Sequence, residues 1–558
     1  MAKSYLTKTY TADFETTTDP LDLRVWVWGL YNIGSGKFNY NNDIDSFFNY
    51  LKYKIEDNAV IYFHNLKFDG EFIFYWLFEN GFEWVDDRKI HHKQFTTLIS
   101  NMGVFYSIRF KWEDKIINFL DSLKLIPFKV AQIPKAFNLS IMKGEIDYHK
   151  ARPIGYEPDK DEINYLNHDV KIVGDALKYF FDQSLNKITI ASNALTEYKT
   201  IIGDKKFKRC FPFLPEDAIM RKSYKGGVVQ VKEEYKSVDI GEGITLDVNS
   251  LYPYVMYEKM LPYGEPIYME GKVKHDKFYN VSIQRLVCNF ELKEGYLPTI
   301  QIKKNFRFKD TEYLKSSEGN DVVLTLTSVD LEMFFEHYEV SNIQYIEGWK
   351  FRSTNTLFKE YIDKWVEVKN ESTISGNAGK RTIAKLMLNS LYGKFGLNPL
   401  VQSKIPFYDR DGYVRYRLGK QETRDPIYVP IASFITAYAR QITLSSAQKN
   451  YDRFLYCDTD SLHLLGSEIP TNLWVDQVAL GAWKIEGQFT RARFLRAKSY
   501  IEEVDGELDI KCAGLPDQCK ESITYENFKK GLTVYGKLQQ KREKGGVYLK
   551  EIEFTIDE

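Results

Sequence analysis

The chain has 558 residues, too many for one hydrophobic core, and so predicts several domains. Its 44% hydrophobic and 27% charged content is typical of a folded water-soluble protein, and a net charge of −1 excludes a strong overall basic field. No apolar run reaches membrane-span length, and the first residues contain no apolar stretch of the kind expected in a secretory signal. Five cysteines without a Cys-x-x-Cys pair argue against zinc or disulfide frameworks and predict a reducing compartment.

Two features of the composition leave nucleic-acid binding open. Aromatic residues make up 15% of the chain, and such rings either fill cores or stack on the bases of a single strand. Basic residues cluster locally, and together the clusters predict a channel for phosphates, although each alone is more often a solvated face. The clusters are residues 205–209, 303–309, 491–498 and 537–544.

The first predicted strand, YTADFETTT, carries two carboxylates on one face. Asp13 and Glu15 are two positions apart, so both project from the same side of the strand while Phe14 enters the core. A strand at residues 60–63 follows, and then a helix with Asp69 in its first turn. Taken singly, the Asp-x-Glu pair is a solvent-facing strand edge and Asp69 is a helix cap.

A longer helix is predicted over residues 162–181. Tyr165 and Asp169 are four positions apart and therefore share one face of it. Its buried stripe consists of Leu166, Val170, Val173 and Leu177. Asp169 and the three earlier carboxylates form a candidate two-metal site, which could activate water and stabilise the leaving oxygen of a phosphodiester.

These motifs, Asp-x-Glu, Asn-x-x-x-Asp at 65–69 and Tyr-x-x-x-Asp at 165–169, resemble those of 3′–5′ proofreading exonucleases. The resemblance implies that Asp13, Glu15, Asp69 and Asp169 hold metal ions, that Tyr165 orients the attacking water, and that Lys143 assists at the scissile phosphate. Residues matching family positions that grip a frayed 3′ end are Thr16, His64, Asn65, Phe68, Phe72, Ser122 and Leu123.

After residue 188 a polar helical stretch leads to the Pro-punctuated segment FPFLPED, where a domain boundary is expected. The following loop contains Tyr224, Lys225, Gly226 and Gly227. Paired glycines signal a turn first of all, but they also let a backbone approach phosphates closely.

A second acidic constellation is divided between two distant segments. Residues 244–246 form a predicted strand that ends at Asp247, and RFLYCDTDSLHLL predicts a hairpin with Asp458 and Asp460 at its tip. Such close carboxylates are best explained by a divalent cation, whereas an ordinary polar turn is the alternative. Tyr252, five positions after Asp247, is either a core aromatic or the floor beneath a bound sugar, where its ring would exclude a 2′-hydroxyl.

A cationic helix is predicted from residue 379 to 396. Arg381, Lys385 and Tyr392 share one face, while Ile383, Leu386, Met387 and Ser390 take the other. It is either a nucleotide-binding helix or a routine amphipathic helix with extended cations. A hairpin at 398–426, a helix with Thr436 and Arg440, and the segment with Lys498 and Tyr500 complete the pattern.

Three ordered motifs, Asp247-x-x-Ser-Leu-Tyr, Lys385-x-x-x-Asn-Ser-x-Tyr and Tyr-Cys-Asp458-Thr-Asp460, resemble motifs A, B and C of family B DNA polymerases. The segments YFHNLKFDG, LKEGYLPTIQIK and LMLNSLYGKF are similar to the protein-primed polymerases of phi29-like bacteriophages. The resemblance implies a multidomain α/β and α+β fold with an RNase H-like exonuclease domain, a right-handed palm, fingers and thumb, and two terminal-protein-region insertions. The implied bounds are 1–188 for the exonuclease, 189–258 and 429–512 for the palm, 259–356 and 397–428 for the insertions, 357–396 for the fingers and 513–558 for the thumb.

The resemblance also implies replication of a linear phage genome by protein priming, with strand displacement and proofreading, in the cytoplasm of an infected bacterium. Asp247, Asp460 and the carbonyl of Val248 would hold two Mg²⁺, replaceable by Mn²⁺, with Asp458 in support. Residues implied to bind the nucleotide are Tyr252, Lys369, Arg381, Lys385 and Tyr392, and those implied to bind DNA are Tyr224, Gly226, Gly227, Thr436, Arg440, Lys498 and Tyr500. Implied partners are template-primer and single-stranded DNA, dNTPs, a terminal protein and a phage single-stranded-DNA-binding protein, with no membrane.

The chain departs from the family pattern in three places. Lys225 stands where Arg is expected, residues 500–512 are shorter, and residues 370–381 are longer, so Lys369 is a weaker match than Lys385. Three other functions compete: a dedicated exonuclease with a non-catalytic DNA-binding part, a nucleic-acid-primed replicase, and a structural DNA-binding protein. The polymerase hypothesis requires that Asp247 and Asp460 meet in space.

Overall fold

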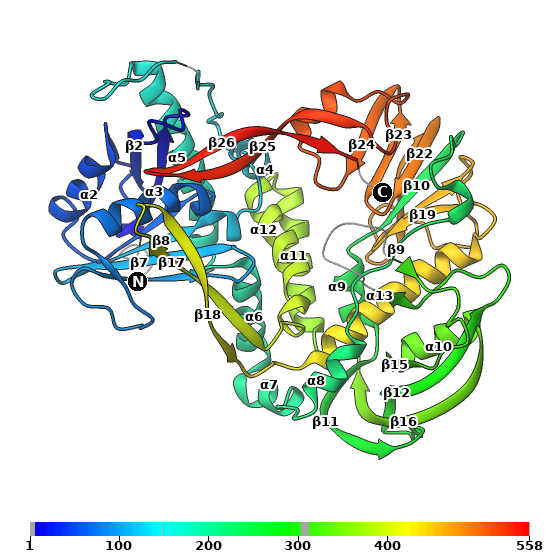
Figure 1. Cartoon of the computed structure of the whole chain (residues 1–558). Coiled ribbons are helices and arrows are strands. Elements are labelled where there is room, and N and C mark those ends of the chain that lie inside the picture. Colours follow the sequence, from blue (N-terminus) through cyan, green and yellow to red (C-terminus); the bar gives the residue numbers. More distant parts are fainter. Residues whose placement is uncertain (1–5, 149, 303–311, 557–558) are drawn as a thin grey trace.

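A computed structural model describes residues 6–148, 150–302 and 312–556, so the predicted basic cluster at 303–309 lies outside it. Figure 1 shows the N-terminal unit on one side, two further β-sheet units on the other, and a group of helices between them. In the described ranges no helix is long and apolar enough to cross a bilayer.

The N-terminal unit is built on an eight-stranded sheet with the order β3-β2-β1-β4-β8-β7-β6-β5. β1 pairs antiparallel with β2, whereas β4 runs parallel to both β1 and β8, as the RNase H-like prediction requires. The strands are β1 (Thr9–Thr16), β2 (Val25–Asn32), β3 (Phe38–Asn41), β4 (Ala59–Phe63), β5 (Glu83–Trp84), β6 (Gln94–Ile99), β7 (Phe105–Trp112) and β8 (Lys115–Asp121). The helices are α2 (Ile44–Tyr53), α3 (Leu66–Glu79), α4 (Ile133–Phe137) and α5 (Lys160–Asp182), with 3-10 turns η1 (Ser122–Lys124) and η2 (Val130–Gln132).

Five strands form the palm sheet, in the order β21-β10-β20-β19-β9. Its second strand, β10, pairs with β20 on one side and β21 on the other, which brings distant segments of the chain together. The strands are β9 (Val229–Val231), β10 (Gly243–Val248), β19 (Phe454–Asp458), β20 (Ser461–Leu465) and β21 (Trp483–Phe489). They are accompanied by α8 (Asp217–Met220), α9 (Leu251–Glu258), α13 (Val429–Lys449), η3 (Arg221–Ser223) and η4 (Glu233–Tyr235).

A second sheet, β11-β16-β12-β15, lies between β10 and the finger helices in the chain. Its elements are β11 (Leu261–Glu270), β12 (Tyr279–Leu292), β13 (Gln301–Ile302), β14 (Glu312–Tyr313), β15 (Val322–Thr327), α10 (Ser328–His337) and β16 (Tyr338–Thr354). Polar links join it to the palm, among them a bidentate ion pair between Arg440 of α13 and Asp330 of α10.

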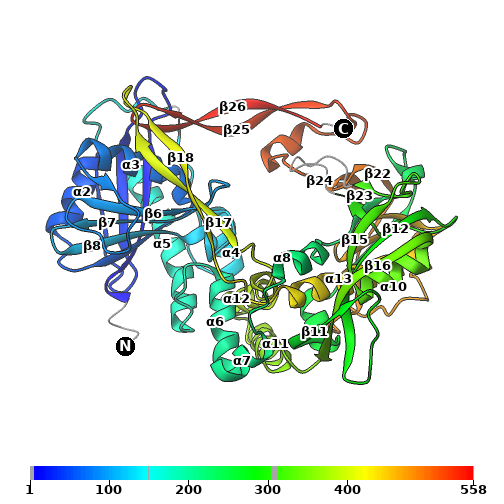
Figure 2. The same cartoon turned by 60° about the horizontal axis from the view of Figure 1, so that its bottom comes forward.

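The central helices connect the units through one continuous hydrophobic core. The core runs from α5 through α6, α11 and α12 to β10 and β20 of the palm sheet. These connecting elements are α6 (Ile190–Ile202), α7 (Asp204–Cys210), α11 (Lys359–Ile374), α12 (Ala378–Ser390) and η5 (Tyr392–Lys394). A hairpin, β17 (Leu400–Tyr408) with β18 (Val414–Thr423), follows them and lies beside the N-terminal unit in both views (Figures 1 and 2).

The C-terminal unit begins before residue 513, the position expected from the sequence. β22 (Arg491–Arg496), β23 (Ser499–Val504) and β24 (Glu507–Cys512) form a separate sheet that shares a hydrophobic cluster with residues up to Ile556. The other elements are η6 (Asp517–Ser522), β25 (Thr533–Glu543) and β26 (Gly546–Thr555). A boundary at 512/513 would therefore cut through one core.

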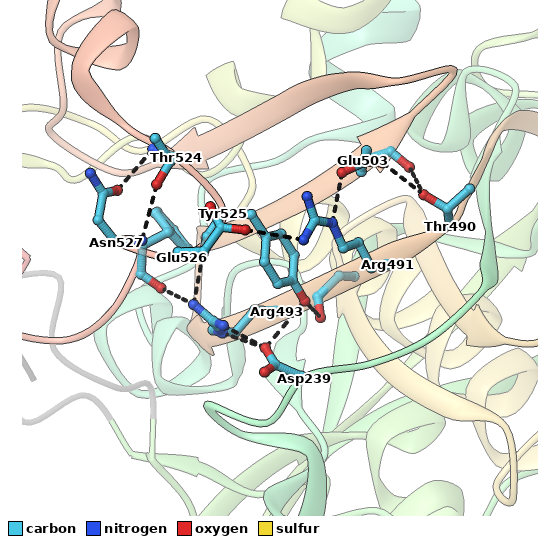
Figure 3. Close-up of polar contacts among 11 residues, drawn as sticks. Asp239, Thr490, Arg491, Arg493, Glu503, Thr524, Tyr525, Glu526 and Asn527 are labelled. Atoms are coloured by element: carbon cyan, nitrogen blue, oxygen red, sulfur yellow. Dashed lines mark hydrogen bonds and ion pairs between the residues drawn. The ribbon is translucent and has the colours of Figure 1, made fainter.

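A stack of charged and aromatic groups fixes this unit to the palm (Figure 3). The ring of Tyr525 lies between the guanidinium groups of Arg491 and Arg493, at 4.2 and 4.7 Å. Arg493 also donates to Asp239 and to the carbonyl of Tyr525, while Arg491 pairs with Glu503. Two cations of the predicted 491–498 phosphate-binding cluster therefore have structural partners.

From this base the β25–β26 hairpin crosses to the N-terminal unit (Figure 2). Arg542 donates to Glu71 of α3 at 2.6 Å, and Glu71 is only 2% exposed. Gly546 lies against the ring of Phe72 so closely that a Cβ there would be 2.2 Å from a ring carbon. The hairpin is thus docked on α3 by an ion pair to a buried carboxylate and by a close glycine contact.

Candidate active sites

The sheet and two helices of the N-terminal unit bring the four predicted carboxylates together. Asp13 and Glu15 lie on β1, and Glu15 is 6% exposed. Asp69, in the first turn of α3, accepts a 3.3 Å hydrogen bond from the backbone N–H of Phe14, so this carboxylate joins α3 to β1 rather than capping its helix. Asp169 is supplied by α5.

The electrostatics of this cluster are those of crowded anions. Burial first, and then repulsion from Asp169, raise the pKa of Asp13 to about 7. Burial and neighbouring carboxylates also raise the pKa of Glu15 and of Asp69 well above their ordinary values. A bound cation would relieve this repulsion.

One lysine and two tyrosines complete the N-terminal site. Lys143 donates to Asp169 Oδ2 at 2.6 Å, and although burial opposes it, this carboxylate raises the pKa of the lysine. Tyr165 lies 5.1 Å beneath the Lys143 ammonium, and its hydroxyl is 3.0 Å from that of Tyr148. Tyr148 was not predicted; it is five positions after Lys143, and no periodic pattern distinguishes it in this loop.

The residues expected to grip a 3′ end surround these carboxylates but differ in accessibility. The ring of His64 lies between Ser122 Oγ and the carbonyl of Phe128, at 2.9 and 2.7 Å, and Ser122 is fully buried. The backbone N–H groups of Asn65 and Leu123 both donate to Asp121, which fixes the loop. Thr16 and Phe68 are half-buried.

Phe72 departs most from the expectation of an open DNA contact. Its side chain is 2% exposed and lies 5.9 Å from the ring of Phe68. The glycine at the tip of the β25–β26 hairpin covers it. A DNA end could reach this ring only if the hairpin moved.

The carboxylate oxygens of the N-terminal site are suited to bind a cation, and one of them has no other partner among the described residues. Asp169 Oδ1 is buried and has no hydrogen-bond partner in the described structure. Among the residues that can be described, no three His, Cys, Asp or Glu side chains are close enough to form a ready-made metal cage. Asp169 therefore has one buried oxygen left to accept a ligand.

In the palm, the predicted meeting of two distant aspartates is confirmed. β10 pairs with β20 so that Asp247 lies opposite Ser461, next to Asp460. The backbone N–H of Val248 donates to the carbonyl of Asp460 at 2.8 Å. Burial and then the charge of Asp460 raise the pKa of Asp247 to about 7, and burial also raises that of Asp460.

Two charged residues beside Asp247 were not predicted from the sequence. Lys484, opposite Asp247 in the β10–β21 ladder, has its Nζ 3.4 Å from Asp247 Oδ1 and 2.7 Å from Glu486 Oε1. The alternation of WKIEGQF would have placed Lys484 and Glu486 on one strand face, but no motif connected that strand to Asp247.

Asp458 is held by its neighbours. Lys498 donates to its Oδ2 at 2.6 Å, and Thr459 donates to its Oδ1 at 3.1 Å. Lys498 is exposed, whereas the ring of Tyr500 packs 5.2 Å from Tyr456 and is only partly accessible. In the protein without DNA, Lys498 is therefore paired with the carboxylate of Asp458.

Two finger helices, α11 and α12, present cations without counter-ions. Within the described residues no carboxylate pairs with Lys369, Arg381 or Lys385. Burial and mutual repulsion lower the pKa of Lys369 and of Lys385, with Lys484 contributing to both. A cluster of cations of this kind is typical of an anion-binding site.

The helix that carries Arg381 and Lys385 is shorter than predicted. α12 ends at Ser390, and Tyr392 begins the 3-10 turn η5, so the expected face of Arg381, Lys385 and Tyr392 does not lie on one helix. Tyr392 instead stacks on Tyr252, with ring centroids 4.2 Å apart and 27° between planes. Burial raises the pKa of Tyr392, and the contact with the Tyr252 side chain opposes this rise.

Two residues expected to bind DNA are buried beneath the surface. Arg440 donates to the carbonyls of Lys225 and Gly226 as well as to Asp330, and its side chain is 5% exposed. Thr436 is 2% exposed and donates to Ala432 in its own helix. As corrections, Arg440 supports the glycine loop from below and Thr436 closes a helical turn.

The glycine loop itself packs on the acidic hairpin. A Cβ at Gly227 would lie 2.5 Å from Thr459 Oγ1, so only glycine fits, while nothing lies within 4 Å of one at Gly226. The backbone N–H of Thr459 donates to the carbonyl of Val228 at 2.7 Å. Tyr224 packs against Gly396, which fixes the other end of the loop beside the fingers.

Comparison with known proteins gives one consistent family. A model described as DNA polymerase type B, organellar and viral, matches residues 52–159 and 145–476. The DNA polymerase of Bacillus phage phi29 is 46% identical over 98% of this chain and 99% of its own. Solved structures of that polymerase, one complexed with single-stranded DNA and one with primer-template DNA and incoming nucleotide substrates, each match with a TM-score of 0.93 at 44% identity, covering 99% of this chain and 100% of theirs. The chain therefore belongs to the type B DNA polymerases of viruses and organelles, among those similar to the phi29 phage enzyme, and is a DNA-directed DNA polymerase.

Proposed function

We propose that this polymerase replicates a linear phage genome in the infected bacterial cytoplasm by protein-primed, two-metal nucleotidyl transfer, with strand displacement and 3′–5′ proofreading. One observation carries the proposal: the palm ladder sets Asp247 beside Asp460, and Lys484, the ion-pair partner of Asp247, lies close enough to the unpaired finger cations Lys369 and Lys385 for its charge to lower the pKa of both. Anionic and cationic halves of this kind suit a metal–triphosphate substrate.

Asp247, Asp460 and the carbonyl of Val248 would hold two Mg²⁺, with Mn²⁺ as a substitute. When bound, these ions lower the pKa of the attacking hydroxyl and neutralise the triphosphate. The chain's own groups would do the rest. Lys385, Arg381 and Lys369 would bind and orient the triphosphate, and the Tyr252–Tyr392 stack would support the sugar and nascent base pair.

The N-terminal site would remove mispaired 3′ nucleotides from a frayed single strand. Asp13, Glu15, Asp69 and Asp169 would hold two divalent ions, which when bound activate a water and stabilise the leaving oxygen. Tyr165, in contact with Tyr148, would orient that water. Lys143, already next to Asp169, would face the scissile phosphate. The phi29 relative captured with single-stranded DNA supports that ligand here.

Two substitutions separate the two activities. Asp460→Ala should abolish dNTP incorporation and leave degradation of single-stranded DNA intact, whereas Asp13→Ala should do the reverse. Both are measured on the same labelled primer with Mg²⁺. A dedicated exonuclease would show no incorporation in either protein, and synthesis by the Asp460→Ala variant would overturn the polymerase site assignment.

Strand displacement is proposed from the hairpin at 400–423. It is held against the N-terminal unit by Tyr408, which donates to Glu79 and stacks on Phe78, and by a bridge between Ser403 and Ser100. A hairpin fixed in this way could keep strands apart ahead of synthesis. Primer extension on a circular single-stranded template tests this, because products longer than one circle require displacement.

Protein priming is proposed from the resemblance and from exposed apolar side chains in the unit of the β11-β16-β12-β15 sheet. These side chains, at 38% to 70% exposure, are Ile267, Tyr268, Phe278, Val323 and Ile343. They would receive the terminal protein, and a phage single-stranded-DNA-binding protein would cover displaced strands. Incubation with dATP, Mg²⁺ and candidate genome-end proteins should give a covalent protein–nucleotide product; extension of nucleic-acid primers alone would favour the nucleic-acid-primed alternative.

A further inference from the structure

Lys484 of β21 lies beside the palm carboxylates. It lies directly opposite Asp247 in the antiparallel β10–β21 ladder, so both side chains project from the same face of the sheet. Its Nζ is 2.7 Å from Glu486 and 3.4 Å from Asp247 Oδ1, and the lysine side chain is 31% exposed. A cation therefore already occupies one side of the carboxylate proposed to bind metal.

The groups facing Lys484 come from two parts of the molecule, the palm sheet and the finger helices. From the palm sheet they are the carboxylates of Asp247, Asp460 and Glu486, whose charges repel one another. From the finger helices they are Lys369 and Lys385, whose charges repel Lys484 itself. Lys484 thus lies between the carboxylates of the palm and the cations of the finger helices, and its carboxylate partners are on the palm side.

We infer that Lys484 is a built-in counter-ion of the polymerase carboxylates, which a divalent cation must displace from Asp247. This inference rests on the proposed metal role of Asp247. A divalent ion ligated at Asp247 would sit about 2.1 Å from the oxygen. An ammonium group 3.4 Å from the same oxygen would be strongly repelled by that ion. The side chain must then turn away.

The displaced ammonium has an available destination. A nucleoside triphosphate held by Lys385 and Lys369 would carry its negative charge to the side of Lys484 that now faces only cations. Lys484 would therefore lower metal affinity in the free enzyme and lower it less when nucleotide is present. Metal binding is coupled in this way to arrival of the nucleotide.

The test measures Mn²⁺ affinity directly, by the electron paramagnetic resonance signal of free Mn²⁺. The parent protein carries Asp13→Ala and Asp69→Ala, which weaken the N-terminal site. Lys484→Gln should bind the palm ion about two- to tenfold more tightly, the range expected for removing one partly exposed charge. Lys484→Arg, which keeps the charge, should bind like the parent.

A matched control removes a similar ion pair elsewhere. Lys511 Nζ is 2.8 Å from Asp509, two positions away on β24, as Lys484 is from Glu486. Lys511→Gln should leave Mn²⁺ affinity unchanged. Adding a dNTP analogue that cannot be incorporated should raise Mn²⁺ affinity more in the parent than in Lys484→Gln. A lysine with a purely structural role would not change this difference in affinity.

The possible results separate the two levels of argument. Unchanged or weaker Mn²⁺ binding by Lys484→Gln overturns the counter-ion role, and Lys484→Met repeats the measurement with a side chain that cannot hydrogen-bond. If Asp247→Asn in the same parent leaves Mn²⁺ binding unaltered, the metal role of Asp247 fails instead. Weaker binding by Asp247→Asn with tighter binding by Lys484→Gln supports both.

Discussion

Val248 and Asp460 are joined by a 2.8 Å backbone hydrogen bond, although they are far apart in the sequence. The bond fixes the end of β10 to the tip of the β19–β20 hairpin, so the positions of Asp247 and Asp460 are set by main-chain pairing rather than by flexible side chains. Rigid placement of this kind is what metal-assisted phosphoryl chemistry requires. Tyr392 of the fingers, in contrast, is joined to the palm by the stacking of its side chain on Tyr252.

Tyr252 should determine the choice between deoxy- and ribonucleotides. Its ring stacks on Tyr392 at 4.2 Å and cannot swing aside easily to admit a 2′-hydroxyl. Replacing it by Val should reduce discrimination against ribonucleotides by roughly 10- to 200-fold, the range for losing a steric pocket contact. The measurement is the ratio of kcat/KM for dNTP and rNTP.

Tyr252→Phe is the matched control, because it keeps the ring and removes only the hydroxyl. It should retain discrimination within about twofold. If Phe and Val variants lose discrimination equally, the hydroxyl rather than the bulk of the ring makes the selection, and the steric explanation fails.

Sequence patterns predicted the ladders better than the side-chain partners. The hairpin at 453–465, the strand ending near Asp247 and the helix with Tyr165 and Asp169 follow from local periodicity and turns, and all three exist. Lys484, Tyr148 and the burial of Arg440 depend on which surfaces face each other, and no local period encodes that. The end of α12 at Ser390 was missed because the next residues continue an apolar pattern while the backbone tightens into a 3-10 turn.

Arg440 should affect DNA binding through the glycine loop and not by direct contact. Its guanidinium is paired with Asp330, which is 9% exposed, and it donates to the carbonyls of Lys225 and Gly226. Arg440→Met should destabilise the protein by about 3 kcal/mol, because a buried carboxylate loses its partner. Thermal unfolding and primer-template affinity are measured together.

The partner substitution distinguishes the two explanations. Asp330→Ala should reproduce the weaker primer-template affinity, because it frees Arg440 from its position under the loop. If Arg440 contacted phosphate directly, removing Asp330 would leave DNA affinity equal or stronger. The double variant Arg440→Met with Asp330→Leu should regain stability, since no unpaired buried charge remains.

The carboxylate cluster of the N-terminal unit should make metal-free stability depend on pH. The folded-state pKa of Asp13 is about 7, above the ordinary value of 3.8, because of burial and the charge of Asp169. Its ionisation therefore disfavours the folded state, with no penalty below about pH 4, a growing one as pH rises, and the full one above pH 7. Asp13→Asn should raise the Tm in EDTA by a few degrees at pH 8 and leave it unchanged near pH 4.

An exposed carboxylate supplies the comparison for this experiment. Asp57, whose side chain is 67% exposed and pairs with Lys8, should give no such pH-dependent gain when changed to Asn. Mg²⁺ should stabilise the wild-type protein at pH 8 more than the Asp13→Asn variant. A Tm for Asp13→Asn equal to that of wild type at pH 8 would contradict the repulsion argument.

The docking of the β25–β26 hairpin on α3 should control processivity. Gly546→Val cannot be accommodated, because its Cβ would lie 2.2 Å from the Phe72 ring, and the hairpin tip must lift away from the N-terminal unit. DNA would then dissociate faster, and product length per binding event, measured with a heparin trap, should fall severalfold while single-nucleotide incorporation persists. Thr533→Val, which changes a side chain at the other end of β25, should keep long products. Arg542→Gln, which removes the ion pair with Glu71 but not the glycine contact, should give an intermediate length; long products from Gly546→Val would show that the hairpin holds DNA without touching α3.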